Sequence, residues 1–453
     1  MNRETRPHVV ILGGGFGGLY AARALEKAPV DVTIIDRRNH HLFQPLLYQV
    51  ATAALNPSDI AAPIRGLVGP KGERVVLSEV EDVDLEARRV KLCDGEVPYD
   101  YLIVATGATH SYFGKDEWAE HAPGLKTLED AVNIRQRVLM AFEKAEREPN
   151  PEIRRELLTF VIVGAGATGV EMAGAFQDIS RHALAKDFQS IDPTSARIIL
   201  LEGAPNVLPS YPEDLSAHAR RSLEKTGVEV RTGAKVTNVD EQGVEVGGTE
   251  RINARTIVWA AGVAASPLGR KLGAEVDRAG RVKVTKNLTL PGHDNVFVIG
   301  DLAHVIDYEG KQVPGVAPAA MQMGKAAARN ILHQIRGEPM FPFQYWNRGM
   351  FSVVGRGSAV GIAFKGMKMH GFFAWIAWLF IHLMFLIGFR NKVIVMVDWA
   401  YSYMTFRRGV RLITGQIRTL QEPCPVPETV PPRPDGRGRQ ERPEEARAMQ
   451  PQT

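Results

Sequence analysis

The sequence predicts an α/β fold, and one motif that occurs twice carries this prediction. The pattern Gly-x-Gly-x-x-Gly begins at Gly13 and again at Gly164, each time after an apolar run and before a helix-forming segment. In such a unit the first glycine permits a tight turn, the second lets the backbone approach a pyrophosphate, and the third allows close helix–strand packing. We therefore expect two Rossmann-like dinucleotide-binding domains, with ligand-facing glycines at Gly13, Gly15, Gly18, Gly164, Gly166 and Gly169.

Each unit also contains an acidic residue at the end of a following strand, suited to bind a ribose diol. In the first unit Asp36 lies 23 residues after Gly13. In the second, Glu202 lies 38 residues after Gly164, and a longer helix or an insertion around 182–193 would explain the greater spacing. An anionic Glu202 would repel a 2′-phosphate, and no arginine follows it, so the sequence favours NADH over NADPH.

Two further apolar runs, Tyr99–Gly107 and Asn295–Ala303, end in small residues and could pass beneath a bound cofactor. Their order resembles that of the two-dinucleotide flavoprotein reductases. The resemblance implies that the first unit binds FAD and that an inserted second unit binds NAD(P)H. It places Asp36 at the adenosine ribose, Thr106 and Gly107 beside the cofactor, and Asp301 at the ribityl chain; a helix N-cap is the alternative role for Asp301.

Composition and cysteine content exclude several other classes of protein. The 453 residues are 45% hydrophobic and 23% charged, which is typical of globular domains. Two cysteines, Cys93 and Cys424, without a Cys-x-x-Cys pair, argue against a disulfide scaffold and against dithiol chemistry. A net charge of +4 gives no indication of a nucleic-acid partner, and the histidines lack the spacing of metal ligands.

The segment HHLFQPLLYQVATAALNPSD at His40–Asp59 makes a more specific resemblance. Across about residues 8–415 the chain resembles the type II NADH:quinone oxidoreductases, which transfer electrons to a membrane quinone, ubiquinone or menaquinone, without pumping protons. The resemblance implies that this loop lies beside the flavin, with pocket residues Phe43, Pro45, Leu46 and Tyr48.

Two polar residues match positions that act in this family. Glu171 follows the second glycine motif, and the resemblance places it near the nicotinamide–flavin contact; stabilisation of the first helical turn is the alternative. Gln322 lies in VAPAAMQMGKAAARNIL, where the family carries a glutamine that can bond a quinone carbonyl. A glutamine without function at the start of a helix is the alternative for Gln322.

The C-terminal part contains an apolar, aromatic run of 19 residues, Gly371–Phe389, with His382 as its one ionisable side chain. A second apolar run, Val393–Phe406, follows a charged turn at 388–392. Basic residues surround both runs, and interfacial tryptophans and tyrosines are frequent, so we expect a surface for anionic lipid. The basic residues are Lys365, Lys368, Arg390, Lys392, Arg407, Arg408 and Arg411. The family resemblance implies a monotopic anchor rather than a single span, which places the protein peripherally on the cytoplasmic face of the cell membrane.

The predicted organisation has five parts. An FAD domain is split into residues 1–150 and 271–340, an NADH domain occupies 151–270, a membrane-anchoring region occupies 341–420, and a Pro-rich, charged tail at 421–453 is expected to be disordered. A helical segment over 127–155 leads into the second domain. Two other functions stay open: reduction of a soluble carrier such as ferredoxin, and redox sensing through a bound partner. A homodimer also stays open.

Overall fold

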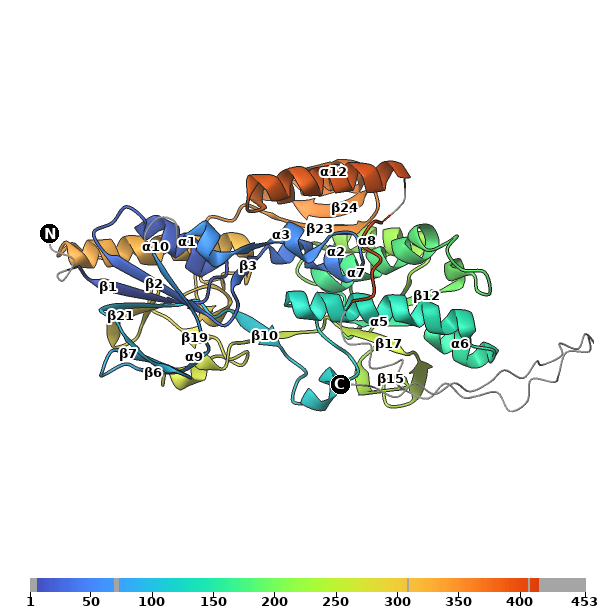
Figure 1. The fold of residues 1–453 in the computed structure, drawn as a ribbon, viewed down its shortest axis with the longest axis horizontal. Coiled ribbons are helices and arrows are strands. Elements are labelled where there is room, and N and C mark those ends of the chain that lie inside the picture. The colour runs from blue at the N-terminus through green and yellow to red at the C-terminus, as the bar shows by residue number, and fades with distance from the viewer. Residues whose placement is uncertain (1–5, 69–72, 308, 406–407, 415–453) are drawn as a thin grey trace, which may run out of the picture. The chain divides into compact units, whose positions relative to one another are not determined.

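The computed structural model describes residues 6–68, 73–307, 309–405 and 408–414. Its first sheet joins strands from distant parts of the chain (Figure 1). In spatial order these strands are β20 (Thr289–Leu290), β21 (His293–Val298), β9 (Tyr101–Val104), β1 (His8–Leu12), β2 (Asp31–Asp36) and β5 (Arg74–Leu77). All neighbours are parallel except β20 and β21. Because β1 is buried along nearly its whole length, its continuous apolar sequence fits a strand covered on both faces.

Helices α1 (Phe16–Leu25) and α10 (Ala317–Ile335) pack against each other beside this sheet. Their contact depends on small residues, since a Cβ atom on Gly324 would lie 2.2 Å from the backbone oxygen of Gly17. The Ala- and Gly-rich sequence that begins α10 therefore serves close packing on α1. This packing fixes where Gln322, on the same helix, can point.

The second nucleotide unit is built on a parallel sheet of four strands. In spatial order these are β13 (Glu229–Thr232), β12 (Arg197–Glu202), β11 (Thr159–Val163) and β17 (Thr256–Trp259). The accompanying helices are α5 (Leu128–Arg147), α6 (Pro151–Leu157), α7 (Ala167–Asp178) and α8 (Glu213–Thr226). An antiparallel sheet follows, made of β14 (Val236–Asp240), β15 (Gly243–Val246) and β16 (Glu250–Asn253).

The helical segment expected over 127–155 is two helices rather than one. Thr127 caps α5 by accepting a hydrogen bond from the Asp130 amide. Asn150 then caps α6 through its side chain, which accepts from the Glu152 amide at 2.9 Å, and Pro151 occupies the first helical position. A proline with a cap before it starts a helix, which explains the break.

Shorter elements connect and cover the two units. The paired strands are β6 (Val80–Asp84), β7 (Arg89–Leu92) and β8 (Gly95–Pro98); β3 (His40–Leu42) with β4 (Ala61–Pro63); β10 (Ala108–His110) with β18 (Val263–Ala265); and β19 (Val282–Lys283) with β22 (Ala303–His304). The short helices are α2 (Leu47–Ala51), α3 (Pro57–Ile60), α4 (Ile64–Leu67) and α9 (Leu268–Lys271). The β10–β18 pair carries the chain between the two halves.

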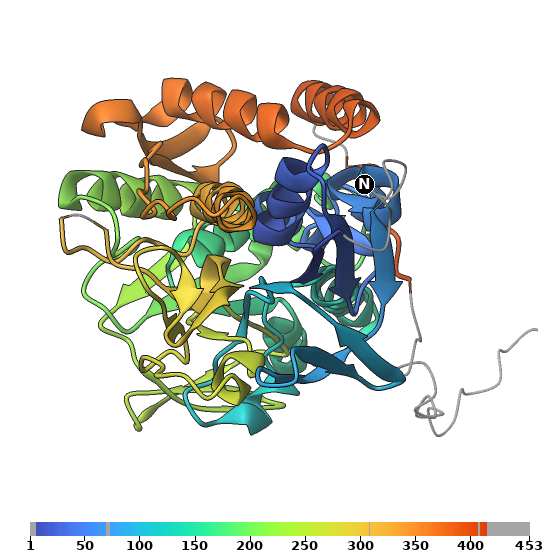
Figure 2. The same ribbon diagram turned by 90° about the vertical axis from the view of Figure 1, so that its left-hand side faces the viewer.

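The C-terminal region is an antiparallel sheet covered by one helix, beside which a second helix packs. The strands are β23 (Met350–Gly355), β24 (Ser358–Ile362) and β25 (Lys368–His370), and the helices are α11 (Gly371–Phe385) and α12 (Phe389–Thr405). In Figures 1 and 2 these helices (orange to red) lie on one side of the molecule. Trp378 of α11 is fully buried in the core that also contains α2 and α7, so this region packs firmly on the second unit.

Two expectations for this region need correction. The apolar run 371–389 is not one helix, because α11 ends at Phe385, and the turn lies at 386–388 rather than at 388–392. Gly388 has φ +90°, a conformation that favours glycine and ends the helical path. Within the described residues, neither helix is both long and apolar enough to cross a bilayer. The predicted tail at 421–453, with Cys424, lies outside the described residues.

Candidate functional site

The first glycine loop has the geometry that its sequence predicts. Gly13 has φ +101°, and a Cβ atom there would lie 2.5 Å from the Ala105 oxygen. A Cβ atom on Gly18 would lie 1.9 Å from the Gly13 oxygen, so helix and loop can approach only at glycine. Gly15 differs from both, because nothing lies within 4 Å of the place its Cβ would take. The loop is therefore closed at its ends and open at Gly15, where a pyrophosphate could approach the backbone.

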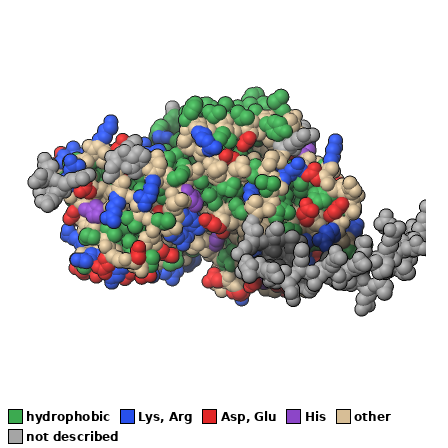
Figure 3. All heavy atoms as spheres, viewed as in Figure 1, with side chains coloured by type: hydrophobic (Ala, Val, Ile, Leu, Met, Phe, Trp, Pro, Cys, Tyr) green, Lys and Arg blue, Asp and Glu red, His purple; other side chains and the backbone are tan. Residues whose placement is uncertain are grey.

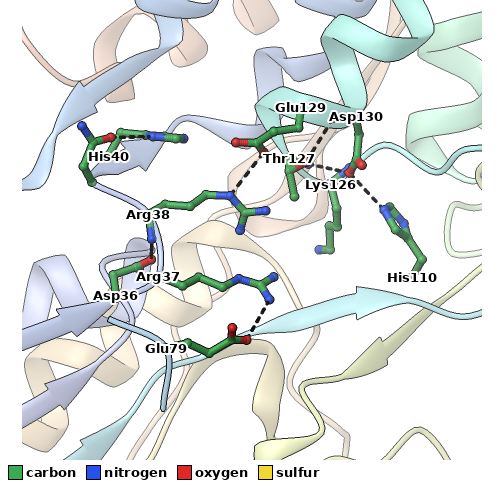
Figure 4. Close-up of polar contacts among 11 residues, drawn as sticks. Asp36, Arg37, Arg38, His40, Glu79, His110, Lys126, Thr127, Glu129 and Asp130 are labelled. Atoms are coloured by element: carbon green, nitrogen blue, oxygen red, sulfur yellow. Dashed lines mark hydrogen bonds and ion pairs between the residues drawn. The ribbon is translucent and has the colours of Figure 1, made fainter. Parts of the chain in front are cut away.

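Asp36, at the end of β2, is bonded directly to this loop. The Gly14 amide donates to its Oδ2 atom at 2.6 Å. The Arg38 amide donates to the Asp36 Oδ1 atom at 2.7 Å (Figure 4). The neighbouring guanidinium groups turn to other acids: Arg38 pairs with Glu129 at 3.2 Å and Arg37 with Glu79 at 3.8 Å. Asp36 keeps lone pairs that could accept from a ribose diol.

The other residues expected around the first cofactor lie at strand and loop ends. Thr106 and Gly107 follow β9, and the Thr106 Oγ1 atom is buried without a partner among the described residues. Pro45 lies in a short 3₁₀ turn, Gln44–Leu46. Asp301 lies inside a 3₁₀ turn, Gly300–Leu302, rather than before it, so it is not an N-cap. Its Oδ2 atom is 3.5 Å from Lys126 Nζ. An unpaired buried hydroxyl and an open loop fit a bound polar cofactor.

The second loop repeats this arrangement. Gly164 has φ +100°, a Cβ atom on Gly169 would lie 1.8 Å from the Gly164 oxygen, and the Cβ position of Gly166 is open. The Glu202 carboxylate accepts from the Ala165 amide at 2.6 Å and from the Ala204 amide at 2.8 Å. Glu202 therefore holds the position in its unit that Asp36 holds in the first. A π-helix, Ile179–Ala183, and a 3₁₀ turn, Pro193–Ser195, supply the extra chain between Gly164 and Glu202.

Glu171 lies in the second turn of α7, not the first, so stabilisation of the helix start does not explain it. Its Oε1 atom accepts from Ser352 Oγ at 3.5 Å, and the Val353 amide also donates to it. Burial raises the pKa of Glu171 to about 8, so the side chain is mainly protonated at neutral pH. α7 can approach β23 this closely because a Cβ atom on Gly174 would lie 2.1 Å from the Val354 oxygen.

Two tyrosines border Glu171. Burial and the nearby carboxyl raise the pKa of Tyr48 and of Tyr211, which keeps both phenols neutral. Tyr48 was expected at the flavin, whereas Ser352 and Tyr211 were not predicted. No sequence motif marks these two residues, because they come from a C-terminal strand and from the loop before α8 and meet Glu171 only in three dimensions.

Gln322 points toward the segment that follows α10. Its Nε2 atom donates to the Trp346 oxygen at 3.0 Å, and its Oε1 atom accepts from the Trp346 amide at 2.9 Å. The side chain thus pairs with both polar groups of one backbone residue and keeps one amide hydrogen for another acceptor. This use of Gln322 was not predicted.

A polar chain that the sequence did not reveal links the C-terminal helices to the loop at 43–52. Trp399 Nε1 of α12 donates to Gln49 Oε1 at 2.7 Å, and Gln49 Nε2 donates to the Tyr48 hydroxyl at 3.0 Å. In the same region, the imidazole of His382 stacks on Trp378 with ring centroids 4.1 Å apart. The C-terminal region therefore reaches the side of the site that holds Tyr48 and Glu171.

Several basic residues expected to face lipid instead form ion pairs with aspartates of the protein. Arg408 is buried and pairs with Asp178, and Arg411 pairs with Asp187. Lys368 pairs with Asp214 at 2.7 Å. Arg407 and the side chain of Lys365 lie outside the described residues. Of the predicted set, Arg390 and Lys392 remain without an acidic partner among the described residues.

Comparisons with known proteins agree with this geometry. Residues 7–324 match the model of the pyridine nucleotide-disulphide oxidoreductase family. The chain is 47% identical over 430 residues to the type II NADH:quinone oxidoreductase NdhA of Mycobacterium tuberculosis, with 91% of this chain and 90% of the relative covered. It is 32% identical to the type II NADH:quinone oxidoreductase of Staphylococcus aureus, with 80% and 90% covered.

A solved structure shows the same fold. The structure of NDH2 from Plasmodium falciparum in complex with NADH superposes with a TM-score of 0.81 at 20% identity, covering 90% of this chain and all of that one. Family match, close relatives and fold agree, and this chain belongs to the type II NADH:quinone oxidoreductases of the pyridine nucleotide-disulphide oxidoreductase family.

Proposed function

We propose that the protein is a peripheral membrane enzyme that oxidises NADH and reduces a membrane quinone through FAD, without pumping protons. The observation that carries the proposal is the pair of open glycine loops, each bonded through a backbone amide to its own acid, Asp36 or Glu202. FAD, when bound, supplies the chemistry that connects hydride acceptance with two-electron reduction of quinone. The protein's own residues would bind and orient FAD, NADH and quinone, and would hold or supply protons.

The first unit would hold FAD. Asp36 would bind the adenosine ribose, and the open backbone at Gly15 would receive the pyrophosphate. The unpaired Thr106 hydroxyl and Gly107 would lie beside the cofactor, Asp301 would bind the ribityl chain, and Pro45 would border the flavin. These assignments are supported by positions at the carboxyl ends of parallel strands, where α/β sheets bind their ligands.

The second unit would hold NADH. Glu202 already accepts two amides and would accept from a ribose hydroxyl, while its charge would repel the extra phosphate of NADPH. Glu171, protonated at neutral pH, would lie near the nicotinamide–flavin contact and hold a proton on its carboxyl group, whose Oε1 atom accepts a hydrogen bond from Ser352. A neutral carboxyl there avoids placing a fixed negative charge beside a reduced cofactor.

Quinone would approach from the side of the C-terminal helices. Gln322 would present its remaining amide hydrogen to a quinone carbonyl while its other polar groups hold Trp346. The structure supports a membrane on this side through the exposed apolar side chains of α11 and α12, which gather along one edge (Figure 3). The protein would lie on the cytoplasmic face of this membrane, because NADH is supplied on that side.

The test is steady-state NADH oxidation with menaquinone and ubiquinone analogues, comparing the wild type with Gln322→Ala. We expect quinone-dependent turnover in the wild type and a raised KM for quinone in the variant, with the KM for NADH little changed. Enzyme on liposomes should turn over without acidifying or alkalising the lumen. Absence of quinone reduction would refute the function, and a proton gradient would refute the non-pumping mechanism.

A further inference from the structure

A crevice of about 410 Å³ lies between the last turn of α1 and the connection from α11 to α12. Neither glycine loop, nor Glu171, nor Gln322 contributes to its walls. The crevice is lined by two kinds of residue: polar or cationic ones on α1 and α12, and apolar ones from the end of α11, the helix connection and the start of α12. They are Tyr20, Arg23, Met384, Phe385, Leu386, Ile387, Gly388, Phe389 and Lys392.

The cations at the crevice are held in place by neutral groups. Lys392 Nζ donates to the Met384 oxygen at 2.7 Å, which leaves two of its three hydrogens available. The Tyr20 ring contacts two cations: Arg23 Cζ lies 5.8 Å and Lys325 Nζ 5.4 Å from its centroid. These contacts orient the charges without neutralising them.

No carboxylate among the described residues forms an ion pair with Arg23, Lys325 or Lys392. This differs from Arg408, Arg411 and Lys368, each of which is paired with an aspartate in the same part of the protein. Arg23 and Lys392 are both partly buried, and partly desolvated cations gain most from a nearby anion. The crevice is therefore complementary to a negatively charged group.

The apolar side chains around the crevice indicate which kind of molecule carries the negatively charged group. Met384 and Phe389 line the crevice and are also 55% and 83% exposed, and they continue into the exposed apolar side chains of α11 and α12. The neighbouring exposed residues are Phe372, Phe373, Ile376, Phe380, Val393, Met396, Val397 and Tyr401. A ligand with an anionic head and hydrocarbon chains would satisfy the cations and the apolar wall together.

We propose that this crevice binds the phosphate of an anionic phospholipid, with Arg23 and Lys392 as its ligands and the acyl chains lying along Met384 and Phe389. The inference rests on the membrane placement proposed above and adds a defined lipid site to it. Arginine and lysine at one phosphate provide charge-assisted hydrogen bonds rather than only a diffuse positive surface.

The experiment measures partition of the full-length, FAD-loaded protein onto vesicles of phosphatidylcholine alone and of phosphatidylcholine with phosphatidylglycerol. The variants are Arg23→Gln, Lys392→Gln and their combination. Arg390→Gln is the matched control, because Arg390 is exposed on the first turn of α12 but does not line the crevice. Binding is measured in about 0.5 M salt, where a Debye length of about 4 Å suppresses diffuse attraction.

On phosphatidylglycerol vesicles at this salt we expect Arg23→Gln and Lys392→Gln each to weaken binding about tenfold. The combination should weaken it by much less than the product of the two, because both side chains serve one phosphate. Arg390→Gln should stay near the wild type. On phosphatidylcholine alone all four should bind like the wild type.

Equal losses for Arg390→Gln and the crevice variants would overturn the lipid site, since they would indicate diffuse attraction. Displacement of the protein from the vesicles by inorganic phosphate would also overturn the lipid site, since it would indicate a site for the free anion. Turnover with a short-chain quinone in detergent is measured in parallel, and a raised quinone KM in the crevice variants would assign the crevice to quinone instead. Failure of the wild type to bind either vesicle would count against the proposed membrane placement itself.

Discussion

The two glycine loops are nearly identical in local geometry but differ in what covers them. In both, the first glycine has φ near +100°, and a Cβ atom on the third would lie within 2 Å of the backbone oxygen of the first. In both, an acid accepts a hydrogen bond from a loop amide at 2.6 Å. The helix after the first loop packs on α10 through Gly17 and Gly324, whereas the helix after the second packs on β23 through Gly174 and carries Glu171. The repeated motif thus builds the binding loops, and the covering elements make them different.

The largest effect should come from filling the closed end of either loop. Gly18→Ala and Gly169→Ala each place a methyl group within 2 Å of a backbone oxygen, so the loop must shift, at a cost of about 1–3 kcal/mol. We expect Gly18→Ala to lose FAD, and Gly169→Ala to keep FAD but bind NADH poorly. Flavin absorbance and NADH titration measure the two effects. As controls, Gly15→Ala and Gly166→Ala should fold normally, because these positions are open. Loss of FAD from Gly169→Ala would contradict separate roles for the two loops.

The next effect concerns the acid of the second loop. Glu202→Gln keeps the size of the side chain but removes the charge that accepts a ribose hydroxyl and repels a 2′-phosphate. We expect the preference for NADH over NADPH, measured as the ratio of kcat/KM values, to fall about tenfold. Asp36→Asn provides the comparison, since it should lower FAD retention without changing this ratio. An unchanged ratio in Glu202→Gln would remove Glu202 from the recognition of NADH.

Glu171 belongs to the second unit and should make kcat and Tm depend on pH. The pKa of Glu171 is raised from 4.5 to about 8, so the wild-type kcat should change through about pH 8 and Glu171→Gln should remove that change. Stability should also respond, because the folded protein binds a proton that the unfolded chain releases between these values. The Tm of the wild type should therefore fall as pH rises from about 4.5 toward 8 and level off above 8, and it should change less in Glu171→Gln. Identical pH profiles for both proteins would exclude this role.

The smallest effect is expected outside both loops. Cys93 is exposed in the turn between β7 and β8, and its Sγ atom lies 3.4 Å from Ser78 Oγ. Cys93→Ser should change NADH:quinone turnover by less than about twofold, as for other surface substitutions. Turnover after treatment of the wild type with a thiol-blocking reagent provides a second measurement. A large loss in either case would indicate thiol chemistry that neither loop explains.

Much of the fold could be predicted because its determinants are local. A glycine that must have positive φ, or that must let a strand and helix touch, is visible in the sequence together with its flanking apolar runs. The acid at a strand end is equally local, and even the long spacing to Glu202 was attributable to extra chain before β12. The helix ends near 148 and 386 were harder to predict, because caps and a single glycine decided them.

The sequence by itself determined the two nucleotide loops, their acids and the apolar character of the C-terminal helices, since each depends on residues close together in the chain. Only the tertiary structure decided that Ser352 meets Glu171, that Gln322 holds Trp346, that Trp399 reaches Tyr48 through Gln49, and that Arg408 is paired inside while Lys392 is not. These contacts join segments up to 350 residues apart. No local pattern encodes such pairs, because they follow from how the C-terminal sheet and helices pack on both nucleotide units.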